Sequence, residues 1–196
     1  VDPRAFFSAG AETPYAIGLV SADTRHPAGR YSFIMHDPFE TLTLKNPHDN
    51  PFAQLKTKLA QWQEDWAGLE AHWPDSPPFK GGAAGLFGYD LAQSLEKLPP
   101  HLPPYAVDDT RLPDMAVGFY DLVLGFDHQT HRCFVFSTGF PAQSAAERSN
   151  IARLKIENLK KVLKKKINLE NEFNQEIEEI SQETQNLYEE LDKWRT

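Results

Sequence analysis

Cysteine is nearly absent from this chain of 196 residues, which contains Cys133 alone. A single cysteine excludes a disulfide framework and any zinc site built from a cysteine cluster. It also fits a reducing compartment, so we expect a cytoplasmic protein. Lys and Arg are outnumbered by Asp and Glu, 20 to 28, and the net charge of −8 argues against general nucleic-acid binding. The chain also lacks a run of about 18 apolar residues, so we expect no membrane span.

Glycine and proline are missing from the end of the chain, since all 11 glycines and all 15 prolines lie at or before Pro141. From Ile151 onward Lys, Glu, Asn, Ile and Leu dominate, and Ala152 is the only alanine. Helix interiors disfavour both missing residues, whereas the turns between strands use them. We therefore expect two parts, a β-rich domain over residues 1–148 and a helical tail over residues 149–196.

Short apolar or alternating runs predict the strands of the first part. These runs are Ala16–Val20, which is typical of a buried strand, Tyr31–Met35, Thr41–Leu44, Gly82–Gly88, the long run Met115–Phe126, and Cys133–Phe136. A turn over Asp127–His131 is expected to join the last two as a hairpin. One helix is predicted to begin with Asn50 as N-cap and Pro51 as its first residue. Its apolar stripe consists of Phe52, Leu55, Leu59, Trp62 and Trp66.

A second helix is predicted to begin over Ala142–Arg148 and to lead into the tail, whose apolar residues recur at the 3-4 spacing of a coiled coil. The two seam positions hold Ile156, Leu163, Glu170, Ile177, Thr184 and Leu191, and Leu159, Lys166, Phe173, Ile180, Leu187 and Trp194. Lys166 and Glu170 place charged residues in the middle of the seam. The seam either tolerates this polar patch or breaks over Lys166–Asn171, where the chain would fold back as a helical hairpin. Basic charge followed by acidic charge favours antiparallel pairing, within one chain or in a homo-oligomer.

The glycine-rich segment Lys80–Asp90 has neither the P-loop nor the dinucleotide-binding spacing. We interpret it as a strand whose glycines let other backbone approach closely. His128 and His131 share the predicted turn with no third ligand, so we expect exposed turn residues there. Cys133 follows as a small buried hydrophobe. Turn or cap roles are expected for Asp90, Asp114 and Asp121, and a solvated or self-paired face for Lys160–Lys166.

One longer segment carries a family resemblance. Pro78–Leu91 reads PFKGGAAGLFGYDL and resembles the "PFxGGxxGxxGYDL" signature of chorismate-utilising enzymes. Further resemblance lies in Leu112–Asp121, Asp127–Gln129, Thr13–Ala16, Ser21–Ala22, Gly29–Phe33 and Asp37–Phe39, so that residues 5–148 are covered. The pattern is most similar to component I of aminodeoxychorismate synthase (para-aminobenzoate synthase), followed by component I of anthranilate synthase.

The resemblance implies an α+β fold like the N-terminal domain of anthranilate synthase component I, here followed by a long C-terminal helix or hairpin. Members of that family aminate chorismate to 4-amino-4-deoxychorismate on the way to folate, with ammonia from a glutamine amidotransferase subunit. Their Mg²⁺ and catalytic residues belong to a chorismate-binding domain with a Gly-Asp-Cys-Tyr-Gln-Val type motif, which this sequence lacks. We therefore expect no catalytic residue, cofactor or metal ion in this chain, and no turnover by it alone.

In the same family the N-terminal domain can hold tryptophan. The resemblance places a possible pocket at Leu19, Val20, Ser21, Gly29, Arg30, Tyr31 and Ser32. The alternative is a strand-loop-strand corner with nothing bound. Two other readings of the chain also stay open, a self-association module driven by the tail and a fragment of anthranilate synthase component I.

Overall fold

A computed structural model describes residues 2–8, 10–45, 50–62, 75–96 and 111–165. The chain divides into a first unit over Val1–Ile156 and a second over Glu157–Thr196, and each is considered by itself. Every strand of the described residues belongs to the first unit, which mixes two antiparallel sheets with short helices as the α+β prediction requires. The expected break at Lys166–Asn171, the seam residues from Lys166 onward, and Trp66 lie outside the described residues.

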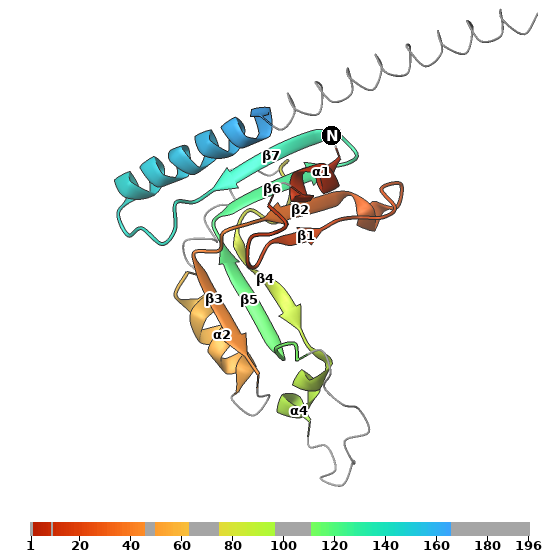
Figure 1. Ribbon diagram of the computed structural model, residues 1–196, viewed down its shortest axis with the longest axis vertical. Helices are drawn as coiled ribbons and strands as arrows, with labels where there is room; N and C mark the ends of the chain where they lie inside the picture. Colours follow the sequence, from red (N-terminus) through yellow and green to blue (C-terminus); the bar gives the residue numbers. More distant parts are fainter. Residues whose placement is uncertain (1, 9, 46–49, 63–74, 97–110, 166–196) are drawn as a thin grey trace, which may run out of the picture. The chain divides into compact units, whose positions relative to one another are not determined.

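The larger sheet has four antiparallel strands in the order β1-β2-β6-β7 (Figure 1). These strands are β1 (Ile17–Leu19), β2 (Tyr31–Met35), β6 (Leu122–Asp127) and β7 (Arg132–Ser137). The last two form the expected hairpin, with turn residues at 128–131. β1 is not buried as predicted, because it pairs on one side only and its Leu19 remains 53% exposed. Apolar character alone does not distinguish an edge strand from a central one.

The smaller sheet has three antiparallel strands in the order β3-β5-β4. They are β3 (Glu40–Leu44), β4 (Gly82–Phe87) and β5 (Met115–Tyr120). The glycine-rich segment is therefore a strand, as predicted. A Cβ added at Gly85 would lie 2.1 Å from the backbone oxygen of Ala116, so glycine is required for the close approach of β4 to β5.

The long run Met115–Phe126 is two strands and not one. It leaves the smaller sheet after Tyr120 and enters the larger sheet at Leu122, with Asp121 between them. The Asp121 side chain is fully buried and its carboxylate pairs with Lys155 at 2.6 Å. A buried charge of this kind interrupts the apolar pattern by a single residue. Asp121 therefore marks the corner in the sequence, and the interpretation of Met115–Phe126 as one long run missed it.

The helix α2 (Pro51–Ala60) begins where the sequence predicts it. Its apolar residues Phe52, Leu55 and Leu59 pack against a core of the smaller sheet. That core contains Leu42, Leu91, Met115, Val117 and Phe119. Trp62 follows the helix and contacts the rings of Phe39 and Phe140 at centroid distances of 5.5 and 5.3 Å. Asn50 occupies the N-cap position but has a φ of 56° and makes no side-chain cap hydrogen bond, so only its position was predicted correctly.

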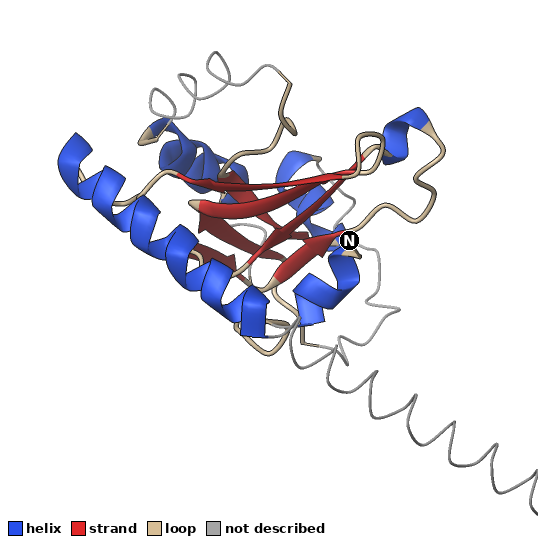
Figure 2. Cartoon of the chain, turned by 90° about the horizontal axis from the view of Figure 1, so that it is seen from above, coloured by secondary structure: helices blue, strands red, loops and turns tan. Residues whose placement is uncertain are grey.

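A second core cluster joins residues of both sheets, with Met35, Tyr120 and Val123 fully buried at its centre. The Tyr120 hydroxyl donates to the backbone oxygen of Tyr15 at 2.6 Å, and burial raises the pKa of this phenol to about 12. The remaining short helices are α1 (Pro3–Ser8), η1 (Pro27–Gly29), η3 (Tyr89–Leu91) and α4 (Ala92–Leu95). Figure 2 shows the strands of the first unit gathered together, with helices beside them.

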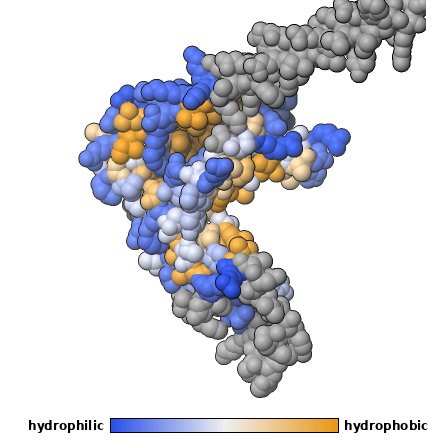
Figure 3. Space-filling view, in the orientation of Figure 1, coloured by the Kyte–Doolittle hydropathy of each residue, from blue (hydrophilic) through white to orange (hydrophobic). Residues whose placement is uncertain are grey.

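Residues 145–156 of the first unit and 157–165 of the second are helical, as predicted from Ala142–Arg148. In the second unit the side chains of Lys160, Lys161, Lys164 and Lys165 are exposed, consistent with a solvated face. Hydrophilic and apolar residues are interspersed on the face that Figure 3 shows. Of the described helices, none combines the length and apolar character that crossing a membrane requires.

Candidate functional site

The corner between β1 and β2 collects the polar residues that the sequence singled out. The antiparallel register places Tyr31 opposite Asp127 and Ser32 opposite Phe126. The backbone N–H of His128 also donates to the backbone oxygen of Arg30 at 2.9 Å. The start of β2 and the β6–β7 turn are therefore held side by side, although about a hundred residues separate them in the sequence.

Arg30 and Asp127 form a two-point ion pair across this junction. Arg30 Nη2 lies 2.7 Å from Asp127 Oδ2, and Arg30 Nε lies 3.1 Å from Oδ1. Asp127 Oδ1 also accepts from the backbone N–H groups of Gln129 and Thr130. The guanidinium and these N–H groups hold the pKa of Asp127 well below its ordinary value of 3.8. The carboxylate stays ionised and fixes both the strand end and the turn.

Ser21, Ser32 and His128 form a second polar chain beside the ion pair. The fully buried Ser32 Oγ accepts from the backbone N–H of Ser21 at 3.0 Å and lies 2.7 Å from His128 Nε2. The Ser21 hydroxyl donates to the backbone oxygen of Tyr31 at 2.6 Å. The only proton of that hydroxyl is therefore used, and its oxygen keeps lone pairs that can accept from a ligand ammonium group.

The arrangement differs from a serine-histidine-aspartate triad in two ways. Ser32 is fully buried, so its oxygen cannot reach a substrate carbonyl. The carboxylate of Asp127 binds Arg30 and the turn backbone, whereas in a triad the acid orients the histidine. This network therefore has the chemistry of a structural clamp, in which the half-buried Ser21 keeps acceptor capacity on its hydroxyl oxygen.

The structure brings together four of the seven residues predicted to form a pocket, namely Ser21, Arg30, Tyr31 and Ser32. Arg30 also lies over the Tyr31 ring, at 4.8 Å. Gly29 instead allows the loop between β1 and β2 to pack closely, since a Cβ there would lie 2.0 Å from the backbone oxygen of Asp23. Leu19 and Val20 at the end of β1 are 53% and 39% exposed.

The sequence interpretation missed His128 and Asp127 as parts of this network. His128 was expected to be an exposed turn residue but is half-buried against Ser32, whereas His131 is exposed as predicted. The signal in the sequence was the resemblance over Asp127–Gln129, which singled out the turn without giving it a partner. Cys133 was expected to be buried but is exposed, because it lies near the start of the edge strand β7.

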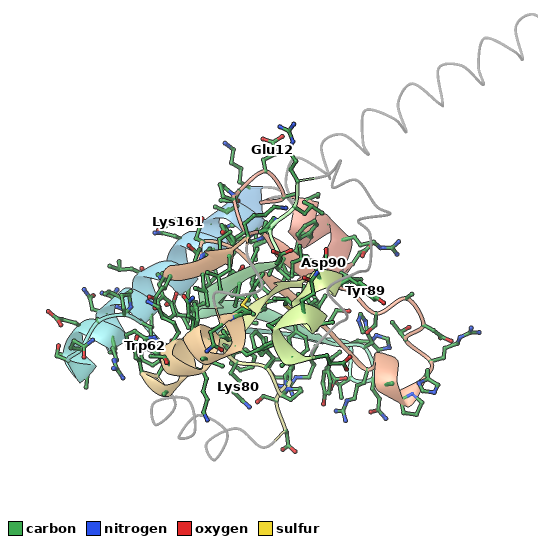
Figure 4. All side chains as sticks on the ribbon, turned by 90° about the horizontal axis from the view of Figure 1, so that it is seen from below. Glu12, Trp62, Lys80, Tyr89, Asp90 and Lys161 are labelled. Atoms are coloured by element: carbon green, nitrogen blue, oxygen red, sulfur yellow. The ribbon has the colours of Figure 1, made fainter. Side chains whose placement is uncertain are left out.

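The aspartates expected to have turn or cap roles differ from one another. Asp90 lies exposed in η3, beside Tyr89, which is 96% exposed (Figure 4). Asp121 is a buried ion-pair partner of Lys155, as described above. Among the described residues no group of three or more His, Cys, Asp or Glu is arranged to hold a metal ion.

Comparison with known proteins places these observations in a family context. No protein-family model matches the chain. Aminodeoxychorismate synthase component 1 of Salmonella typhimurium is 37% identical over 139 residues, which are 63% of this chain and 28% of that protein. The Escherichia coli protein of the same name is 35% identical over 145 residues, 67% of this chain and 30% of that protein.

Anthranilate synthase component 1 is a more distant relative. The protein from Geobacillus stearothermophilus is 31% identical over 125 residues, 57% of this chain and 23% of that protein. A crystal structure of anthranilate synthase component I from Streptococcus pneumoniae TIGR4 aligns with a TM-score of 0.46 and 18% identity, over 72% of this chain and 36% of that one. The chain spans less than a third of the length of these curated relatives. Over about two thirds of its own length, the chain is a homologue of aminodeoxychorismate synthase component 1 and anthranilate synthase component 1.

Proposed function

We propose that this chain is the N-terminal, non-catalytic portion of an aminodeoxychorismate synthase component I. The observation that carries the proposal is the extent of the match, which takes in about two thirds of the chain and less than a third of each relative. The matches to aminodeoxychorismate synthase are both long and similar, at 37% over 139 and 35% over 145 residues. The matches to anthranilate synthase are less identical, at 31% over 140 residues, or shorter, at 36% over 89 residues, which favours the former branch. A cytoplasmic location and an amidotransferase partner for the complete enzyme are parts of the same proposal.

The test of the non-catalytic role is chorismate consumption. The purified chain is incubated with chorismate, Mg²⁺ and ammonium at alkaline pH, and chorismate is followed by chromatography. Full-length aminodeoxychorismate synthase component 1 of Escherichia coli, assayed in parallel, is the positive control. We expect chorismate to persist with this chain and to disappear with the control. Ammonia-dependent loss with this chain would contradict the proposal.

Within that role we propose that the β1–β2 corner binds a free amino acid, with tryptophan as the family precedent. Ser21 is half-buried, and the lone pairs of its Oγ suit an ammonium group, while the edge of β1 offers backbone groups to a carboxylate. The exposed side chains of Leu19 and Val20 offer an apolar surface for the indole. Arg30 supports the corner through Asp127 and is already paired, so it acts by positioning.

Calorimetry with millimolar tryptophan tests the amino-acid site. We expect measurable binding heat for the unmodified chain and a clear loss for Ser21→Ala, which removes the acceptor oxygen. Ser8→Ala, at an exposed position of helix α1, is the matched control and should bind as the unmodified chain does. Heat no larger than that of dilution would refute the site.

We propose self-association through the helical segment as a second candidate role, carried by exposed apolar residues outside the predicted seam. Leu154 and Val162 are large apolar residues of the helical segment and are 44% and 54% exposed. Light scattering after size exclusion, over a range of concentrations, gives the solution mass. A multiple of 22.2 kDa would support pairing of the tail between chains, and a constant 22.2 kDa would contradict it.

A further inference from the structure

The first unit contains a hollow that lies apart from the β1–β2 corner described above. Its volume is about 350 Å³, and it runs along β7, between the segment that precedes β4 and the helix at Ile156. Ligand pockets have volumes of about 300–1,000 Å³, so this one suits a small molecule. It shares no lining residue with the Ser21–Ser32 corner.

A single lysine supplies the charge of this hollow. Lys80 lines it and is only 7% exposed, which is unusual for a lysine. Among the described residues its ammonium group has neither a hydrogen bond nor an ion pair. Figure 4 labels this side chain, which comes from the short connection immediately before β4. The side chain of Lys80 is largely buried, and an ammonium group that lacks a protein partner at the end of such a side chain is complementary to an anion.

An unpaired hydroxyl lies in the same hollow. Thr138 Oγ1 is buried from solvent and has no hydrogen-bond partner among the described residues. A buried hydroxyl of this kind costs stability unless something satisfies it. The hydroxyl of Ser137, by contrast, already donates to Asp121 at 3.5 Å. Lys80, an obligatory donor, is thus the polar group of the lining that a ligand can reach, because the Thr138 hydroxyl is closed to solvent.

The rest of the wall is mostly apolar. Phe134 and Phe136 contribute rings that lie nearly parallel, with centroids 6.1 Å apart, and Ile156 adds an aliphatic side chain. Flat apolar walls of this kind suit a ring, which can stack against or edge onto the phenylalanines. A fully hydrated inorganic anion would leave these walls without a partner.

From the volume of the hollow, the unpaired lysine and the apolar walls we propose that the hollow binds a small aromatic carboxylate. The carboxylate accepts from the Lys80 ammonium, and the ring lies against Phe134, Phe136 and Ile156. This site is separate from the proposed amino-acid corner and does not depend on the family reaction. A charged hydrogen bond is worth about 1.5–3 kcal/mol, so its loss should weaken binding roughly 10- to 100-fold.

The experiment is a titration of the intact chain with benzoate, in which calorimetry measures the binding heat. A second titration uses 4-fluorobenzoate and measures binding from its ¹⁹F signal. Benzamide has the same ring and no charge, so we expect it to bind at least about tenfold more weakly than benzoate. Tryptophan should not displace benzoate, because the two proposed sites share no residue. Equal binding of benzoate and benzamide, or no binding of benzoate at millimolar concentration, would overturn the proposal without reference to any variant.

Variants then locate the site. Lys80→Met keeps the length of the side chain and removes the charge, so benzoate binding should fall by about tenfold or more. Lys80→Arg should retain binding, and Thr138→Val should change it little, because the Thr138 hydroxyl is closed to solvent. Lys56→Met changes an exposed lysine of α2 and is the matched control. Circular dichroism confirms that each variant is folded. Equal affinities of the Lys80→Met and Lys56→Met variants would place benzoate elsewhere and refute the assignment.

Discussion

At the scale of single residues, His36 makes the stability of the fold depend on pH near neutrality. Its Nδ1 is buried with no hydrogen-bond partner, and its ring stacks on Phe7 with centroids 6.3 Å apart. Burial lowers its pKa from the ordinary 6.5, and nearby Asp37 offsets part of this effect. The neutral ring is therefore the form that the fold accommodates.

The sign of the pH effect follows from that lowered pKa. The unfolded chain binds a proton near pH 6.5 and the folded chain only at lower pH, so stability falls as the pH drops below about 6.5. His36→Phe keeps a ring against Phe7 and removes the titration. We expect the difference in unfolding free energy between pH 8 and pH 5 to be smaller in this variant. Urea unfolding at both pH values measures it, and an unchanged difference would show that His36 is not responsible.

Substitution of two glycines by alanine tests whether a neighbouring backbone or a neighbouring side chain can move to make room for a Cβ. A Cβ at Gly85 would lie 2.1 Å from the backbone oxygen of Ala116, whereas a Cβ at Gly18 would lie 3.0 Å from the ring of Phe7. Backbone in a central strand cannot move aside, but a ring can shift. We expect Gly85→Ala to destabilise the fold by several kcal/mol, on the order of severe overpacking, and Gly18→Ala by less than about 1 kcal/mol. Similar urea midpoints for the two variants would contradict this explanation.

At the scale of elements, the buried pair of Asp121 and Lys155 attaches the helix over residues 145–156 to the corner between the sheets. Lys155→Met would leave a fully buried carboxylate without its cation, at a cost of about 3–5 kcal/mol. The double variant Asp121→Asn with Lys155→Met removes both charges and should recover much of that loss. Lys164→Met, at an exposed helical position, is the control and should change the unfolding free energy little. Equal losses in the single and double variants would show that the charge pair is not what holds the helix.

Prediction from the sequence succeeded for elements whose pattern is local. The start of α2, the limits of β2 and the β6–β7 hairpin follow from spacing and turn residues, and the structure confirms them. Prediction from the sequence failed where residues distant in the sequence determine the burial or the limits of a strand. The exposure of β1 depends on which strands flank it, and the division of Met115–Phe126 depends on a cation supplied by Lys155.

The distinction between local pattern and distant partners also explains which residues of the candidate site could be predicted. Ser21, Arg30, Tyr31 and Ser32 were found through a family resemblance, and the structure brings them together. Asp127 at the end of the neighbouring strand β6 and His128 in the turn after it contact Arg30 and Ser32, from which they are 97 and 96 positions away in the sequence. Neither composition nor periodicity records such a pairing. The hollow beside Lys80 was likewise invisible, because an isolated lysine in a sequence is normally a solvated one.

At the scale of the whole molecule, the corner at Asp121 has a consequence for synthesis. β5 and β6, on either side of it, are interior strands of the two sheets, yet they come after β1 to β4 in the chain. On the ribosome the first four strands emerge before the strands on which they assemble, with only β1 and β2 able to pair early. We expect nascent chains stalled before residue 115 to be digested by protease, and chains whose residue 137 has cleared the exit tunnel to resist it. Both sheets would then be acquired in one late step, so this polypeptide would depend on holdase chaperones for most of the time that it is being made.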